Sequence, residues 1–363
     1  MHRFVLLDAM RGLAALVVMS MHMVWMLVPI PPLGHFYLAV DFFFMLSGFV
    51  LANAYQERLA HSQMGFKDFV LVRLKRLYPL TLLGGAMGYA LYLATTFLGP
   101  VRKMSPDFDD LAYMFFALTT IPNQILNNPW PFNGPSWSLF FEFAINFIWA
   151  AFLFRAGMPG LIVLLLVSAA ALTTSGIYYG NISGGMPNVI NSLPRVFYSF
   201  FMGILLHRLY LAGVTRMLPK VPAWVTVAAM LAVFVPSSAS VDFDTNPPGV
   251  ALYGWSVDLF ACFIVFPLVI LIGAATEISS ARLRSIFLYM GVLSFPLYIT
   301  HDPIGAFVKV ASFRIVPDFG AVIFLPLAIV AAIVFAALAD YLYDRPIQRW
   351  LQARKVKARS LTS

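Results

Sequence analysis

Charged residues are scarce in this chain, and cysteine is almost absent. Asp, Glu, Lys and Arg make up 11% of the 363 residues, whereas a soluble domain carries roughly 25%. The single cysteine, Cys262, excludes a disulfide framework, and its apolar surroundings in the sequence do not favour a thiol nucleophile. No cluster with metal-ligand spacing stands out, and the net charge of +8 does not gather in a way that indicates nucleic-acid binding.

Long apolar runs dominate instead, since 61% of the residues are hydrophobic. Each run approaches the roughly 20 residues that a helix needs to cross a bilayer. We therefore expect an all-α polytopic membrane protein with about ten transmembrane helices. The expected spans are 8–27, 37–55, 79–98, 136–154, 160–178, 193–210, 222–239, 250–274, 287–310 and 319–342.

The distribution of Lys and Arg predicts the orientation. If residues 110–122 (DLAYMFFALTTIP) do not cross, the loops on one side hold only Arg102, Lys103 and Arg314, and most other basic residues lie on the opposite side. The positive-inside rule then places both termini in the cytosol. Residues 110–122 become one short re-entrant or interfacial segment on the outer face.

Two parts of the chain follow from this pattern. Residues 1–343 form the expected transmembrane domain, and residues 344–363 form a basic cytosolic tail. A basic juxtamembrane run of this kind is attracted to anionic lipid.

Several ionisable residues fall inside the expected spans, where an unpaired charge is costly. In "RGLAALVVMSMH", Arg11 and His22 are eleven positions apart, so they are displaced by only about 20° in azimuth and about 16 Å along one helix. The topology places four ionisable groups from four spans at a similar depth in the outer half: His22, Asp41, Glu142 and His301.

Two further patterns extend this cluster. Ser294, Tyr298 and His301 follow one another at helical spacing and form a single stripe. On the inner side, a dense cationic patch in "RLKRLYP" lies at a depth similar to that of Arg11, and guanidinium groups suit phosphate. The patch comprises Arg73, Lys75, Arg76 and Tyr78.

Each residue also has a structural interpretation. His22 alone would more often be a hydrogen-bonding residue in helix packing, Arg73 and Arg76 would be orientation signals, and Asp41 would neutralise a neighbour. Ser294 and Tyr298 would most often pack between helices. The joint arrangement of an outer acid–base cluster and an inner cation cluster favours a functional site.

Five stretches carry a resemblance to a known family, in the family's own order. They are "LDAMRGLAALVVMSMH" with Arg11 and His22, "AVDFFFMLSGFVLA" with Asp41, Ser47 and Gly48, "RLKRLYP" with Arg73 and Arg76, "PSWSLFFEFAIN" with Trp137, Ser138, Leu139 and Glu142, and "GVLSFPLYITHDPI" with Ser294, Tyr298, His301 and Pro303. The chain resembles the integral-membrane acyltransferase-3 family, of the O-acetylase type that modifies bacterial surface polysaccharides. Pro296 departs from the pattern and is expected to kink its span.

The resemblance implies transfer of an acyl group, commonly acetyl, from cytosolic acyl-CoA to a sugar hydroxyl of a glycan or glycolipid outside the bacterial inner membrane. It implies three groups of residues and no metal. The expected catalytic residues are His22, Glu142 and His301. The expected acyl-CoA-binding residues are Arg11, Arg73, Lys75, Arg76 and Tyr78. The expected acceptor-pocket or oxyanion residues are Asp41, Trp137, Ser294, Tyr298 and Arg195.

The expected partners are acyl-CoA, the glycan acceptor and membrane lipids, and the sequence gives no indication of the oligomeric state. Two alternatives stay open at this point. A transporter or flippase would use the polar groups to line a passage, although we find no internal repeats of the kind that such proteins show. A non-catalytic subunit of a polysaccharide export machine would leave the buried ionisable cluster without a chemical purpose.

Overall fold

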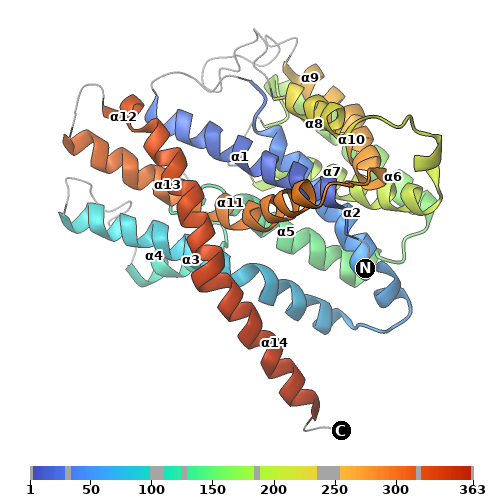
Figure 1. Ribbon diagram of the computed structural model, residues 1–363, viewed down its shortest axis with the longest axis horizontal. Helices are drawn as coiled ribbons and strands as arrows, with labels where there is room; N and C mark the ends of the chain where they lie inside the picture. Colours follow the sequence, from blue (N-terminus) through green and yellow to red (C-terminus); the bar gives the residue numbers. More distant parts are fainter. Residues whose placement is uncertain are drawn as a thin grey trace. The chain divides into compact units, whose positions relative to one another are not determined.

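The computed structural model describes residues 3–28, 34–98, 110–123, 129–183, 189–234, 254–315 and 320–360. Within these ranges the chain is helical and contains no strand (Figure 1). The expectation of an all-α membrane protein is therefore confirmed. The loop with Arg102 and Lys103, the expected span end at 239 and the span starts at 250 and 319 lie outside the described residues.

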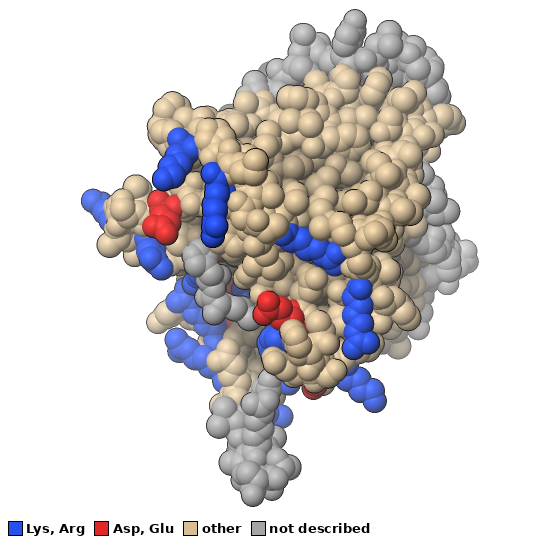
Figure 2. All heavy atoms as spheres, turned by 90° about the vertical axis from the view of Figure 1, so that its right-hand side faces the viewer, with Lys and Arg blue, Asp and Glu red and all other residues tan. Residues whose placement is uncertain are grey.

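Eight helical stretches are long and apolar enough to cross a membrane, among the residues described. They are Val5–Leu27, Leu38–Ala60, Phe66–Thr96, Ser136–Leu153, Met158–Tyr179, Gly254–Ala275, Ala281–Ser312 and Leu325–Arg354. Helix α7 (Val189–Leu211), which carries Arg195 and Arg208, and the shorter apolar helix α8 (Ala223–Ala232) occupy the other two expected positions. Figure 2 shows one face of the molecule, on which uncharged side chains form a broad area and the visible Lys and Arg side chains gather away from it.

The chain divides into two compact units. Unit 1 comprises Met1–Met21, Ile30–Phe66 and Phe141–Ser294, and unit 2 comprises His22–Pro29, Lys67–Phe140 and Phe295–Ser363. The long helices α1 (Val5–Leu27) and α11 (Ala281–Ile315) contribute residues to both.

Unit 1 is organised around the pair α2 (Leu38–Ala60) and α7. The backbones of the two helices meet at Gly48 and Gly203, where a methyl group would collide with the carbonyls of Phe200 and Met45. Small residues allow this close approach of membrane helices. The remaining elements of unit 1 are α6 (Met158–Tyr179), the 3₁₀ turn η2 (Val214–Met217), α8, α9 (Gly254–Phe260), the π-helical turn η3 (Ala261–Val265) and α10 (Phe266–Ala275).

Helix α5 (Ser136–Ile148) begins in unit 2 and continues in unit 1 through the π-helical turn η1 (Trp149–Leu153). The other helices of unit 2 are α3 (Phe66–Leu98), α4 (Asp110–Thr119), α12 (Gly320–Ile323), α13 (Leu325–Leu338), the π-helical turn η4 (Ala339–Asp344) and α14 (Arg345–Ser360). Because α14 follows η4 without a break, the expected boundary between the transmembrane domain and the basic tail, at residues 343 and 344, stays a prediction.

Helix α11 is continuous through Pro296.

Helix α4 is too short to cross a bilayer, as expected for the segment 110–122. It packs beside α3 rather than beyond the end of α3: the Tyr92 and Tyr113 rings lie 5.3 Å apart, and the Tyr78 hydroxyl donates to the Leu118 carbonyl at 3.2 Å. These contacts run in opposite directions along the two helices, so α4 is antiparallel to α3. The arrangement favours a re-entrant segment over an interfacial one.

Candidate active site

Two histidines that the sequence places on different helices are hydrogen-bonded in unit 2. Nε2 of His301 lies 3.0 Å from Nδ1 of His22, and Nδ1 of His301 lies 3.0 Å from the carbonyl oxygen of Leu297. A carbonyl only accepts, so Nδ1 of a neutral His301 carries the proton and its Nε2 is the acceptor. His22 then donates through Nδ1–H, and in the neutral form of His22 this tautomer has its unprotonated nitrogen at Nε2.

A carboxylate missed by the sequence analysis lies beside this pair. Asp302 follows His301, and its carboxylate accepts the backbone N–H of Gly134 at 3.0 Å. It also lies within electrostatic range of His22. The adjoining Asn133 donates to the Ile299 carbonyl at 2.8 Å, so this loop is fixed to α11 through two consecutive residues.

Tyr298 is buried one turn before Asp302 and contacts the start of α5. Its hydroxyl lies 2.7 Å from Oγ of Ser138 and 3.4 Å from the carbonyl oxygen of Pro135, to which Ser138 also donates. Both hydroxyls therefore already have partners. Trp137, which precedes Ser138 in the sequence, is half-buried. Assignment of Tyr298 and Trp137 to an acceptor pocket stays a prediction.

The arginine of α1 has partners in unit 1. Arg11 donates through Nε to Oγ of Ser294 at 3.0 Å and through its Nη2 to the Gly291 carbonyl. The same Nη2 lies 3.2 Å from the carboxylate of Asp8, one helical turn earlier. Ser294 therefore orients Arg11, and Asp8 compensates its charge.

Asp41 and Arg195 form a buried ion pair with each other. Nε and Nη2 of Arg195 lie 3.1 and 2.5 Å from the two carboxylate oxygens of Asp41, which is a bidentate geometry. Nη2 also donates to the Tyr37 carbonyl at 3.3 Å. The sequence analysis assigned both residues to the acceptor, and that role stays a prediction.

A second buried carboxylate, Asp258, lies near this pair in unit 1. It accepts hydrogen bonds from the Tyr37 hydroxyl at 2.7 Å and from the Ile182 backbone at 3.0 Å, and it lies 2.6 Å from Nδ1 of His35. The Tyr37 phenol donates its hydrogen to this carboxylate, which only accepts. This network fixes the segment before α2 to α9.

Glu142 and Asn146 lie one turn apart on α5. The carboxylate of Glu142 accepts a hydrogen bond from Ser47 at 3.1 Å. Asn146 is fully buried, and neither its amide nitrogen nor its amide oxygen has a hydrogen-bond partner among the described residues. Leaving a buried polar group unsatisfied costs about 1–3 kcal/mol, so this amide marks a place where a polar ligand group would be stabilising.

The cationic patch lies on α3 in unit 2. Lys75 and Arg76 are exposed and Arg73 is half-buried. The side chain of Gln348 on α14 donates to the Lys75 carbonyl at 2.8 Å, which fixes the beginning of the basic tail to this patch. The charged ends of the exposed residues are therefore available to a phosphorylated ligand.

Signals for the missed residues differ. Asp8 precedes Arg11 by three positions, a spacing at which helical side chains meet, so the sequence could have indicated it. Asp302 stands next to a predicted catalytic residue. No local pattern pairs His35 with Asp258, which is 223 positions away.

Comparison with known proteins supports an enzymatic assignment. The acyltransferase-3 family model, described as an acyltransferase domain, matches residues 4–341. The chain belongs to this family. It is therefore a membrane acyltransferase, and this membership argues against a transporter or a non-catalytic subunit.

One curated relative is named "Protein 2 in picA locus" of Rhizobium radiobacter. It is 38% identical over 186 residues, which cover 47% of this chain and 93% of the relative. No solved structure matches the chain. Across the described part of the chain, no group of three or more His, Cys, Asp or Glu residues is placed to hold a metal ion.

Proposed function

We propose that this acyltransferase moves an acyl group, commonly acetyl, from cytosolic acyl-CoA to a sugar hydroxyl on the outer side of the bacterial inner membrane. Family membership gives the reaction class. The observation that carries the proposal further is the His22–His301 pair, because its hydrogen bonds leave an unprotonated imidazole nitrogen on His22. Imidazole titrates near neutral pH and is the commonest general base.

In the proposed reaction, Nε2 of His22 removes the proton of the acceptor hydroxyl. The hydroxyl oxygen bonds to the thioester carbonyl carbon, and the carbon–sulfur bond breaks. The proton passes from His22 to the departing thiolate, which leaves as CoA. The nearby carboxylate of Asp302 stabilises the imidazolium while it carries the proton.

Attack on the thioester by His22 itself, with a transient acyl-imidazole, would use the same nitrogen. Rapid quenching of enzyme mixed with labelled acetyl-CoA in the absence of acceptor distinguishes the two routes. Label attached to His22 supports the acyl-enzyme route, and its absence supports direct transfer.

The donor site is the second part of the proposal. Lys75 and Arg76 suit the CoA phosphates because their side chains are exposed. Arg11 binds a phosphate oxygen while Asp8 and Ser294 hold its guanidinium in place.

The acceptor is proposed to be a surface or lipid-linked glycan. The name of the picA-locus relative states a gene neighbourhood and no substrate. Mass spectrometry of surface glycans from a deletion strain tests this part: loss of one acyl mass, restored by the intact gene but not by the His22→Gln gene, supports it. Unchanged glycans, with acyl transfer by the purified protein to another acceptor, contradict it.

The proposed orientation is also testable. Gln63 is exposed in the loop expected in the cytosol, Tyr178 is exposed at the opposite end of its span, and the native Cys262 is buried. A membrane-impermeant maleimide should label Tyr178→Cys in intact inner-membrane spheroplasts and Gln63→Cys only after permeabilisation. The reverse pattern would overturn the orientation.

A further inference from the structure

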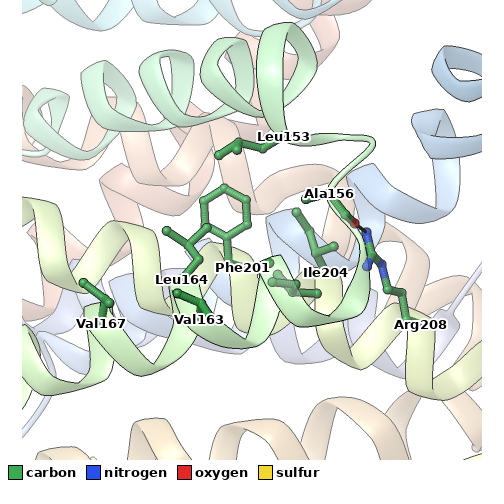
Figure 3. A pocket seen from close by; sticks show the side chains of 10 residues that line it. Leu153, Ala156, Val163, Leu164, Val167, Phe201, Ile204 and Arg208 are labelled. Carbon is green, nitrogen blue, oxygen red and sulfur yellow. Dashed lines mark hydrogen bonds between the residues drawn. The ribbon is translucent and has the colours of Figure 1, made fainter.

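An apolar groove with a basic end lies in unit 1, away from the histidine pair. It has a volume of about 310 Å³ and runs between α6 and α7 (Figure 3). Its apolar lining includes Leu161, Leu164, Val167, Phe201 and Ile204. From Gly160 to Val167 the groove follows α6 for about 10 Å.

Arg208 stands at one end of this groove, and Val167 stands at the other (Figure 3). The Nη2 of Arg208 donates to the Ala156 carbonyl at 2.8 Å. This bond uses one of the five N–H donors of a guanidinium. No acidic side chain pairs with Arg208 among the described residues, so none of these residues neutralises its charge.

The N-terminus of α6 adds positive potential at the same end. The helix begins at Met158, and its cap, Gly157, offers no side-chain hydrogen bond. Unsatisfied N–H groups and the helix dipole favour an anion at such a terminus.

The groove opens along an exposed face of α6. Val163, which lines the groove, is 60% exposed, and Leu166, outside the lining, is 65% exposed. In a membrane-spanning helix such side chains contact the hydrocarbon chains of lipids, so a chain from the bilayer enters the groove without crossing water.

We propose that this groove binds an anionic phospholipid, with one acyl chain along the apolar lining and the phosphate at Arg208 and the α6 N-terminus. The groove and the lipid are complementary, because the apolar lining suits an acyl chain and the cation Arg208 at its end suits a phosphate. In the orientation proposed above, this end faces the cytosolic leaflet, where polybasic segments attract anionic lipids. The inference does not rest on the reaction, so its test uses binding rather than activity.

Native mass spectrometry of the purified full-length protein gives the test. Phosphatidylglycerol is titrated against phosphatidylcholine with identical chains, and inorganic phosphate is titrated separately. Phosphatidylglycerol should occupy one site at concentrations about tenfold lower than phosphatidylcholine, since hydrogen bonds to a charged group are the strong ones. Equal affinity for both lipids, or full competition by inorganic phosphate alone, would overturn the proposal.

Two variants test the charge and the open space of the groove separately. Arg208→Gln keeps a donor for the Ala156 carbonyl but removes the charge, and Arg155→Gln is the control of equal charge outside the lining. A methyl group at Gly160 would meet no atom within 4 Å. Gly160→Phe therefore fills the groove with Arg208 intact, and Leu166→Phe is its control on the same helix.

Both test variants should weaken phosphatidylglycerol binding by about tenfold or more, while the controls change it less than about threefold. If Arg208→Gln does not fold, Gly160→Phe still decides the question through loss of binding. Unchanged phosphatidylglycerol binding in folded Gly160→Phe protein would show that the lipid lies elsewhere and would contradict the proposal.

Discussion

Nε2 of His301 and Nδ1 of His22 are 3.0 Å apart, and the Leu297 carbonyl fixes which of the two rings donates. The proton-accepting atom of the neutral pair is therefore Nε2 of His22. This relationship separates the roles of the two histidines: His22 offers the base, and His301 holds its ring in the reactive tautomer.

The first prediction concerns the base. His22→Gln retains a polar side chain but cannot take up a proton, so we expect kcat for acetyl transfer to fall by a factor on the order of 10² to 10⁴. His22→Ala should be equally impaired. Transfer of labelled acetyl from acetyl-CoA by protein in proteoliposomes measures kcat, and acetyl-CoA affinity should stay nearly unchanged.

The control for this prediction is that His22→Gln protein is folded, which circular dichroism and size-exclusion chromatography measure. Near wild-type transfer by this variant would show that His22 only packs, and His301 or Glu142 would become the next candidate for the base.

The second prediction concerns the positioning role of His301. The amide oxygen of His301→Gln is able to accept the hydrogen bond from Nδ1–H of His22, whereas His301→Ala removes the acceptor. We expect His301→Gln to retain at least about tenfold more kcat than His301→Ala, because orientation is the function lost in the alanine variant. The KM for acetyl-CoA should be similar in both.

The pH profile distinguishes this from a direct catalytic role. If His301 itself accepted the proton, His301→Gln would be as inactive as His301→Ala, and both would lose the fall in kcat toward low pH that protonation of a general base produces.

The third prediction addresses the cationic patch. Orientation of the chain needs only positive charge, whereas bidentate phosphate recognition needs the guanidinium fork. Arg76→Lys should insert normally but lose about 1.5–3 kcal/mol of acetyl-CoA binding free energy, the range for a hydrogen bond to a charged group. Isothermal titration of the purified protein measures this change.

Arg282→Lys is the control, because Arg282 is also exposed but lies outside the patch. Equal affinities of Arg76→Lys, Arg282→Lys and the wild type would leave Arg76 as an orientation signal.

The sequence predicted what local patterns determine. Apolar run length predicted the helices, and the charge bias predicted that residues 110–122 form a re-entrant or interfacial segment, a choice on which the packing of α4 against α3 bears. The family motifs named His22 and His301, and their hydrogen bond is consistent with a shared role.

Contacts between distant segments could not be predicted in this way. Asp41 and Arg195 are 154 positions apart, and the sequence does not show that they form an ion pair. Each was therefore assigned to the acceptor pocket. The tautomer of His22 depends on the Leu297 carbonyl, a backbone group that no side-chain motif records. Tertiary hydrogen bonding therefore decides which buried polar groups are already satisfied.

The last prediction tests whether the Asp41–Arg195 pair stabilises the fold. Both side chains are almost completely buried, so replacement of one leaves the other charge uncompensated. Arg195→Met and Asp41→Leu should each lower the free energy of unfolding by about 3–5 kcal/mol. The double variant should lose less than the sum of the two, because apolar replacement of a whole buried pair is often tolerated. Chemical denaturation in mixed micelles measures the coupling free energy between the two substitutions.

If Arg195 instead serves the acceptor, Arg195→Met should unfold like the wild type and raise the KM for the acceptor. The effects of the two substitutions on the free energy of unfolding should then be additive.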